Sequence, residues 1–323
     1  MTAVQKFAPG LVLAVVGAVI AYVLDLGVKA LTGVSTLILV AIIVGMILGN
    51  ARPLSDRWRP GLTLASKQVL RLGVALLGFS ISLSTLADLG LVSLATIVAI
   101  VVGGTALTFA LTRWSSLSRE HVLMIGAGCT ICGAAAISAV ESVLPKRKAE
   151  EFASAIAVIV VLGTAMIAVG PLVAVAFGLT PEQAGLFIGG STHEVGQVVA
   201  AGMISGVVEM AVAVKLGRVL LLAPVVALIG MGGSAKPNAK TLFPLFIQGF
   251  LLAVLLRTFL PIPEELLSLL AELKTWLFAA AMFALGTTVT AQTLAKSGLR
   301  PFLVGLTVTA GVIGIASLGT LLI

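Results

Sequence analysis

Apolar segments of about twenty residues recur along almost the whole chain, and they constrain the fold more than any other feature. A bilayer core about 30 Å thick requires roughly 20 apolar residues per helix. Alternating segments typical of strands do not recur, and open sheet edges are not stable in lipid. We therefore predict an all-α polytopic membrane protein with about nine to eleven transmembrane segments. The clearest segments are 8–24, 31–49, 72–87, 90–112, 152–177, 207–230, 241–260, 275–293 and 301–322.

Charge is scarce in this chain of 323 residues. Charged residues make up 10% and hydrophobic residues 59%, whereas a soluble domain carries roughly 25% charged residues. This composition excludes a soluble enzyme, and we expect no enzyme activity, cofactor or metal. The net charge of +7 would suggest nucleic acid in a soluble protein, but here we interpret it as a signal of membrane orientation and expect no nucleic-acid partner.

Two further segments, 119–144 and 181–205, are long enough to enter the membrane but are interrupted by glycine, hydroxyl and polar residues. If both leave the membrane on the side they entered, most of the 20 lysines and arginines share one side. The positive-inside rule favours this re-entrant topology, with the N-terminus cytoplasmic and the C-terminus outside. In this re-entrant topology Lys29, Arg257 and Lys274 are the basic residues predicted on the outer side. Broken helices that span the membrane are the alternative.

The two interrupted segments resemble each other. Leu117-Ser-Arg-Glu120 and Leu179-Thr-Pro-Glu182 both start with a helix-cap signal near an acid. A second resemblance joins 60–112 to 264–322, although apolar helices also resemble one another by chance. Inverted repeats with interrupted helices are typical of secondary transporters. We predict one transporter domain, 1–323, with inverted, interwoven halves at approximately 31–177 and 181–323.

The first polar motif is Gly126-Ala-Gly-Cys-Thr-Ile-Cys-Gly133. Its glycines disfavour a continuous helix, and an unwound stretch in lipid must line a cavity or be buried in protein. Free N–H groups at the start of a half-helix form an anion site. Tight packing of small residues is the alternative, and two thiols alone do not make a zinc site. The predicted substrate contacts here are Cys129, Thr130, Cys132 and Gly133.

The second motif is Gly189-Gly-Ser-Thr-His-Glu-Val-Gly-Gln197. Adjacent His and Glu residues at membrane depth are costly, so a functional role is the default interpretation; a structural pair at the interface is the alternative. Gln197 stands where a zinc-protease helix would carry its second histidine, which excludes that metal site. We predict that His193 and Glu194 couple transport to protons or sodium. The predicted substrate contacts are Ser191, Thr192, His193 and Gln197.

The third motif places Lys215 and Arg218 on one face of the span 207–230. Two buried cations need anionic partners. Glu194 or Glu209 could compensate one cation, which would leave the other for an anionic substrate, and an arginine fork suits an oxyanion. We therefore assign both cations to substrate binding and Glu209 to ion coupling. Snorkelling to one membrane surface is the alternative.

Other acids lie at predicted span ends and are interpreted as solvated loop charges. These are Asp25, Asp88 and Glu182.

Gly128-Cys-Thr-Ile-Cys-Gly133, Gly190-Ser-Thr-His-Glu-Val-Gly-Gln-Val-Val-Ala-Ala-Gly202 and Lys215-Leu-Gly-Arg218 together resemble the YeiH-like family. These are bacterial inner-membrane proteins to which sulfate export is ascribed by inference. The acid after the motif histidine is usually Asp in that family, whereas it is Glu194 here. Position 130 is commonly Ala, whereas it is Thr here. The resemblance implies an exporter of sulfate or a related sulfur oxyanion.

The motifs and the resemblance together predict a secondary transporter of a small inorganic anion in the bacterial inner membrane. An ion-coupled organic-anion transporter or a cation/proton antiporter on the same fold is the first alternative. A membrane thiol redox enzyme that uses Cys129 and Cys132 is a distant one. Faces rich in small residues would allow a homodimer, although they serve packing within one chain equally well.

Overall fold

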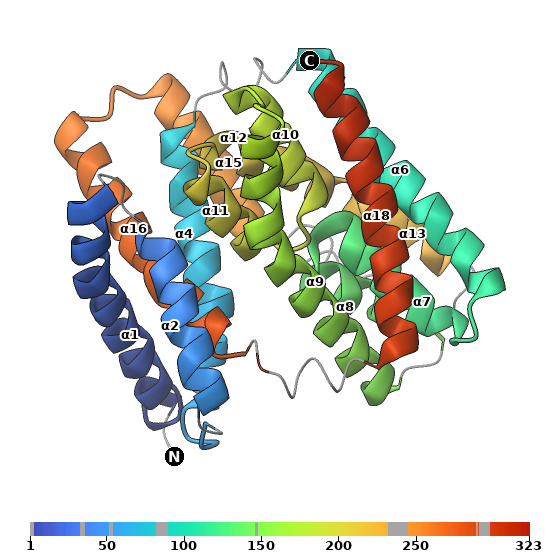
Figure 1. Ribbon diagram of the computed structural model, residues 1–323, viewed down its shortest axis with the longest axis horizontal. Coiled ribbons are helices and arrows are strands. Elements are labelled where there is room, and N and C mark those ends of the chain that lie inside the picture. Colours follow the sequence, from blue (N-terminus) through green and yellow to red (C-terminus); the bar gives the residue numbers. More distant parts are fainter. Residues whose placement is uncertain are drawn as a thin grey trace. The chain divides into compact units, whose positions relative to one another are not determined.

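The computed structural model describes residues 3–32, 36–51, 54–81, 90–145, 148–231, 245–288, 290 and 298–323 (Figure 1). Every regular element in these ranges is a helix, which confirms the predicted all-α fold of a polytopic membrane protein. Seven helices in the described ranges are long and apolar enough to cross a membrane. They are Lys6–Ala30, Arg59–Ser80, Gly90–Trp114, Ala149–Ala176, Val208–Gly230, Glu264–Gly286 and Leu299–Leu321. Shorter apolar helices are Leu37–Ala51, Ala134–Val143, Val195–Ile204 and Leu245–Phe259.

The chain divides into two compact units. Unit 1 contains Met1–Thr85 and Phe246–Ala291, and unit 2 contains Leu86–Leu245 and Gln292–Ile323. Each unit therefore takes residues from both predicted halves of the chain. The interwoven inverted repeat stays a prediction.

In unit 1 the N-terminal helices pack against helices from a segment much later in the sequence. α1 contacts α2 and α16, and α16 also contacts α2 and α4 (Figure 1). Four consecutive elements between residues 59 and 80 form one continuous helical span with a π-helical turn in its middle. The elements are α1 (Ala3–Thr32), α2 (Leu37–Ala51), α3 (Arg59–Leu64), η1 (Ala65–Val69), α4 (Leu70–Leu77), η2 (Gly78–Ser80), α15 (Leu245–Phe259) and α16 (Glu264–Gly286).

Glycines let α2 and α16 approach until their backbones touch. A Cβ on Gly45 would overlap the carbonyl oxygen of Phe283, and one on Gly286 would overlap that of Ile42. Association of helices in lipid depends on such close packing, because the lipid is as apolar as the helix faces.

Replacing Gly45 with alanine is expected to lower the melting temperature of the purified protein by several degrees, because the helices must separate. A loss of about 1 kcal/mol corresponds to roughly 2–4 °C for a domain of this size. Gly27→Ala in α1 is the matched control, since nothing lies within 4 Å of its added Cβ. Alanine is the better helix former by about 1 kcal/mol, so this control should melt no lower than the wild type. Equal melting of the two variants would contradict the close packing.

The interpretation of Asp25 as a solvated loop charge was wrong. Asp25 lies inside α1 with 3% of its surface exposed. Its carboxylate accepts hydrogen bonds from the backbone N–H of Thr36 (2.5 Å) and from the Thr36 hydroxyl (3.1 Å). The helix continues past the acid because these donors compensate the buried charge.

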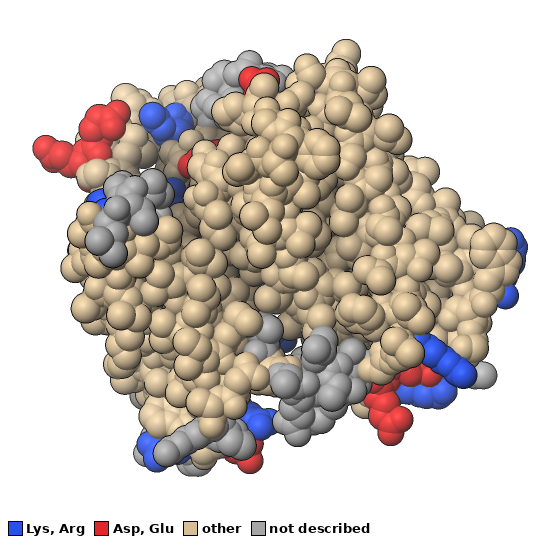
Figure 2. Space-filling view, viewed as in Figure 1, with Lys and Arg blue, Asp and Glu red and all other residues tan. Residues whose placement is uncertain are grey.

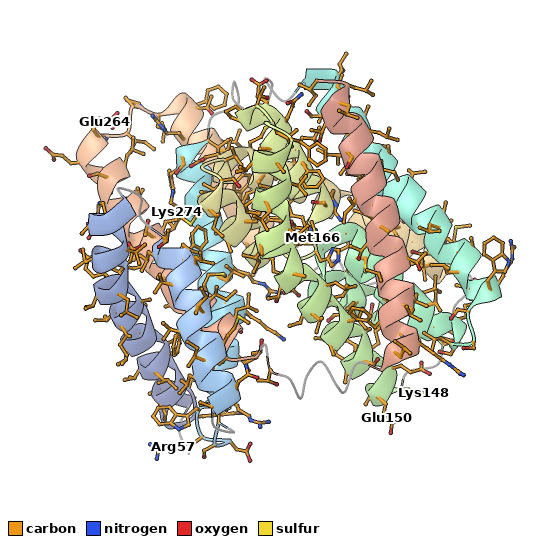
Figure 3. The ribbon with its side chains drawn as sticks, in the orientation of Figure 1. Arg57, Lys148, Glu150, Met166, Glu264 and Lys274 are labelled. Carbon is orange, nitrogen blue, oxygen red and sulfur yellow. The ribbon has the colours of Figure 1, made fainter. Side chains whose placement is uncertain are left out.

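Lys274 also differs from its predicted place directly before a span at 275–293. α16 begins earlier, at Glu264, directly after Pro263, with two acids in its first turn. Lys274 therefore lies well along α16, away from Glu264 (Figure 3). It is 8% exposed, and its Nζ donates to the Ser80 hydroxyl at 2.9 Å.

Unit 2 contains the two interrupted segments and every predicted site residue. α18 packs against α6 and α10 (Figure 1). α12 and α13 are separated at Leu221, three residues before Pro224, as expected for a helix interrupted by proline. The elements are α6 (Gly90–Trp114), α7 (Arg119–Ala127), η3 (Gly128–Cys132), α8 (Ala134–Val143), α9 (Ala149–Ala176), α10 (Pro181–Ser191), α11 (Val195–Ile204), α12 (Val208–Leu220), α13 (Leu222–Gly230) and α18 (Leu299–Leu321).

Uncharged residues cover most of the face shown in Figure 2, and the charged residues visible on it lie mainly near its margins. Lys148 and Glu150 lie together at the start of α9 (Figure 3). The predicted orientation depends also on residues outside the described ranges, so it stays a prediction. Charged residues that lie outside the described ranges are Arg52, Asp88, Lys146, Arg147, Lys236, Lys240 and Lys296, and Asp88 is one of the predicted loop charges.

Candidate functional site

The helices of both interrupted segments contain a break, as predicted, and the re-entrant topology of these segments stays a prediction. Ser118 caps α7 by accepting the N–H of His121, and Thr180 caps α10 in a reciprocal capping box with Gln183. The first helix is interrupted at Gly133, which has φ +69°, and the second is interrupted over residues 192–194. In both segments the break therefore comes a similar number of residues after the residue that caps the first half-helix.

Arg218 joins the ends of the two half-helices that precede the breaks. Its side chain is fully buried, and it donates to carbonyl oxygens of both segments. Carbonyls at helix C-termini carry partial negative charge, so a guanidinium stabilises them. The bonds run from Nε to Thr130 (3.0 Å), from Nη1 to Gly189 (3.0 Å), Gly190 (2.7 Å) and Thr192 (3.0 Å), and from Nη2 to Cys129 (3.0 Å) and Thr130 (2.6 Å).

Lys215 lies on the same face of α12, one turn before Arg218, and is also fully buried. Its Nζ donates to the carbonyl oxygen of Thr192 at 2.8 Å. Lys215 and Glu194 also attract each other electrostatically. Carbonyl dipoles thus stabilise both cations, in addition to the carboxylate partner that the sequence suggested.

Glu194 connects the two half-helices that follow the breaks. It is the N-cap residue of α11, and its Oε1 accepts the backbone N–H of Ala134, the first residue of α8, at 3.1 Å. A Cβ on Gly133 would overlap the Glu194 side chain, so the close approach requires glycine. Helix N-termini carry partial positive charge. One partly buried carboxylate therefore lies where two such ends meet.

The polar residues Ser191, Thr192, His193 and Gln197 of the second motif are fully buried. Gln197 accepts the backbone N–H of Glu194 through Oε1 at 3.0 Å. His193 Nε2 lies 2.9 Å from the Thr309 hydroxyl, and Ser191 donates to the carbonyl of Phe187 within α10. Four buried polar atoms of the first two motifs have no hydrogen-bond partner among the described residues: Thr130 Oγ1, Thr192 Oγ1, His193 Nδ1 and Gln197 Nε2.

Cys129 and Cys132 are both free thiols and both buried. Cys129 Sγ lies 3.6 Å from the carbonyl oxygen of Gly305 and 3.7 Å from the Thr309 hydroxyl. Glu209, the third residue assigned to ion coupling, is partly exposed in the first turn of α12. It precedes Lys215 by about 1.7 turns of helix.

Sequence reasoning missed Thr309 and Gly163. Thr309 on α18 contacts both His193 and Cys129. Gly163 on α9 accommodates Gln197, because a Cβ there would overlap the Gln197 amide. No local signal distinguishes either residue from the many small residues of apolar helices.

Gly133→Ala is expected to destabilise the protein and disrupt the junction, because it adds backbone strain and displaces Glu194. A residue other than glycine at such a backbone conformation costs roughly 1–3 kcal/mol. Gly206→Ala is the control, since Gly206 has the same φ of +69° but nothing within 4 Å of its Cβ. Thermal unfolding should show a larger loss for Gly133→Ala than for Gly206→Ala. Equal losses would show that contact with Glu194 adds nothing to the strain.

Fold and site together define a polytopic helical membrane protein in which two broken helices meet around buried charges. The chain belongs to the family described as conserved hypothetical protein 698, whose sequence model matches residues 9–305.

Three relatives illustrate the match. A UPF0324 membrane protein of Corynebacterium glutamicum is 42% identical, over 98% of this chain and 93% of its own length. The UPF0324 inner membrane protein YeiH of Escherichia coli K12 is 35% identical, over 95% of this chain and 91% of its own length. A UPF0324 membrane protein of Neisseria meningitidis is 33% identical, over 83% of each chain. These relatives confirm the predicted resemblance to the YeiH-like family. No solved structure matches the chain.

Proposed function

We propose that the protein is a secondary active transporter of a small inorganic anion, such as sulfate or a related sulfur oxyanion. The observation that carries this proposal is the meeting of two half-helix N-termini, those of α8 and α11, at Glu194 in a membrane protein. Transporters bind substrates at such discontinuous helices, with half-helix N-termini directed at anionic groups. The anion would bind at this junction.

The buried cations support an anionic substrate. Lys215 and Arg218 are both fully buried on one face of α12, and Lys215 interacts electrostatically with the partly buried carboxylate of Glu194. Buried charge inside a membrane protein marks a transport pathway more often than a structural feature. The buried donors of Thr192 and Gln197 that lack partners among the described residues add hydrogen-bonding capacity at the same breaks.

Movement of one helix bundle relative to the rest would expose the bound anion to alternate sides. A proton or sodium ion would drive the cycle, with His193, Glu194 and Glu209 as the candidate coupling residues. The proposal includes no enzyme activity, cofactor or nucleic-acid partner. The thiol redox alternative requires accessible thiols, and the burial of Cys129 and Cys132 supports packing instead.

The proposed location is the bacterial inner membrane, because the Escherichia coli relative is named an inner membrane protein. The proposed topology has a cytoplasmic N-terminus and an outer C-terminus. A homodimer is compatible with the faces of small residues.

The test is flux of radiolabelled sulfate into proteoliposomes that contain the purified protein. Counterflow against internal sulfate should exceed that of empty vesicles and should respond to an imposed proton or sodium gradient. An organic anion such as citrate, and sodium efflux in exchange for protons, are measured in parallel. Sodium–proton exchange without any anion flux would overturn the proposal in favour of a cation/proton antiporter.

A further inference from the structure

We propose that the carboxylate of Glu194 is a built-in competitor for the anion site, so that a divalent oxyanion binds only together with one proton on Glu194. This inference rests on the proposed function and deepens it, because it specifies the charge of the substrate and its coupling ion.

The Glu194 carboxylate lies at the N-terminal ends of two helices. Glu194 Oε1 accepts the N–H of Ala134 at the start of α8, while Glu194 itself caps α11. Both helices have ten residues, so each has a developed N-terminal end that favours negative charge. A substrate oxyanion would bind the same N–H groups. The two anions therefore cannot occupy this junction together.

A second observation indicates that this junction binds more than the carboxylate. The Gln197 side chain is fully buried, and its Oε1 accepts the backbone N–H of Glu194, which fixes its amide at the start of α11. The amide nitrogen, Gln197 Nε2, has no hydrogen-bond partner among the described residues. A buried donor left without a partner costs about as much as a lost hydrogen bond. An oxyanion in place of the carboxylate would accept from this donor.

The titratable and charged groups around Glu194 determine how a proton on its carboxylate changes the charge of the junction. The Cys132 thiol of η3 and the Lys215 side chain of α12 both interact electrostatically with it, and Arg218 lies one turn beyond Lys215. His193 precedes it in the connecting segment, where its Nε2 is engaged by a hydroxyl of α18. Gly163 of α9 contacts Gln197 and contributes no titratable group.

Charge balance then selects the substrate. With Lys215 and Arg218 counted as cations and Glu194 as an anion, these three side chains together carry one net positive charge. A proton on Glu194 raises this to two and frees the N–H of Ala134. A divalent oxyanion neutralises both charges, whereas a dianion beside an ionised Glu194 would face like charge in a region of low dielectric.

The test is sulfate binding to the purified full-length protein, measured by isothermal titration calorimetry from pH 5 to pH 8. Titrations in buffers of different ionisation enthalpy give the number of protons taken up. Only the protonated form binds in this scheme, so the apparent Kd should rise about tenfold per pH unit once Glu194 is ionised. About one proton should be taken up per sulfate in that range.

Glu194→Gln is the decisive variant, because glutamine resembles the protonated acid in shape and charge. It should bind sulfate with no proton uptake and an affinity that changes less than twofold with pH. Glu194→Asp should retain the proton uptake, because it keeps the carboxylate. Glu182→Gln, at an exposed acid in the first turn of α10, should behave as the wild type. Thermal unfolding verifies that each variant is folded.

The outcomes separate this inference from the proposed function. Sulfate binding to the wild type without proton uptake, or loss of sulfate binding in folded Glu194→Gln, overturns the competition while the transporter stands. If Glu194→Gln does not fold, Glu194→Asp and the wild type still decide, because the absence of proton uptake in both contradicts the inference. Absence of both sulfate binding and sulfate flux in the wild type overturns the proposed function as well.

Discussion

Arg218→Met is expected to cause the largest loss of stability of any single substitution in unit 2. The guanidinium donates to five backbone carbonyl oxygens from two broken helices, and the side chain is fully buried. Each buried carbonyl left without a donor costs roughly 1–3 kcal/mol. Even partial loss should lower the melting temperature by at least about 10 °C, given roughly 2–4 °C per kcal/mol. Fluorescence-detected thermal unfolding of the purified protein measures this effect.

Two further variants test whether the loss of stability comes from the lost contacts with the carbonyl oxygens. Arg218→Lys keeps the charge but replaces a planar fork of five donors with a point charge that has three. It should therefore melt between the wild type and Arg218→Met. Arg300→Met removes an exposed arginine of α18 in the same unit and should melt as the wild type. If Arg218→Met melts within 2 °C of Arg300→Met, the carbonyl contacts do not hold the breaks together.

Lys215→Met is expected to abolish anion transport while the protein stays folded. Lys215 donates to a single carbonyl oxygen, that of Thr192, and Arg218 also donates to this oxygen. The Thr192 carbonyl oxygen therefore still accepts a hydrogen bond from Arg218 when the lysine is removed. Loss of a buried cation next to a bound anion costs about 2–5 kcal/mol. Sulfate flux in proteoliposomes should consequently fall by about 30-fold or more.

Lys148→Met is the matched control for this loss of charge. Lys148 is exposed at the start of α9 and pairs with Glu151 at 3.1 Å, an interaction that contributes about 0–1 kcal/mol at a surface. Its flux should remain close to that of the wild type. Normal flux in folded Lys215→Met would remove this lysine from the substrate site.

Local signals in the sequence were sufficient to predict the broken helices. Ser118 and Thr180 carry helix-cap chemistry, and Gly133 adopts a positive φ that other residues avoid. These features act within a few residues, so they can be recognised along the chain. They placed the two interruptions and the polar motifs correctly.

The partners of the buried charges could not be predicted in the same way. Arg218 and Lys215 bind backbone carbonyls, which every residue has and no sequence pattern distinguishes. Thr309 reaches His193 from a helix more than one hundred residues away. Asp25 and Lys274 lie inside helices because Thr36 and Ser80 provide partners for them, and such pairs depend on tertiary packing.

A structure of the protein with bound selenate tests the central claim most directly. Selenate resembles sulfate, and its anomalous scattering locates the anion without ambiguity. We predict one site at the junction of α8 and α11, within hydrogen-bonding distance of the Ala134 N–H, with Glu194 displaced from that N–H. Selenate bound elsewhere, or no bound selenate at concentrations that saturate transport, would contradict an anion site between the two broken helices.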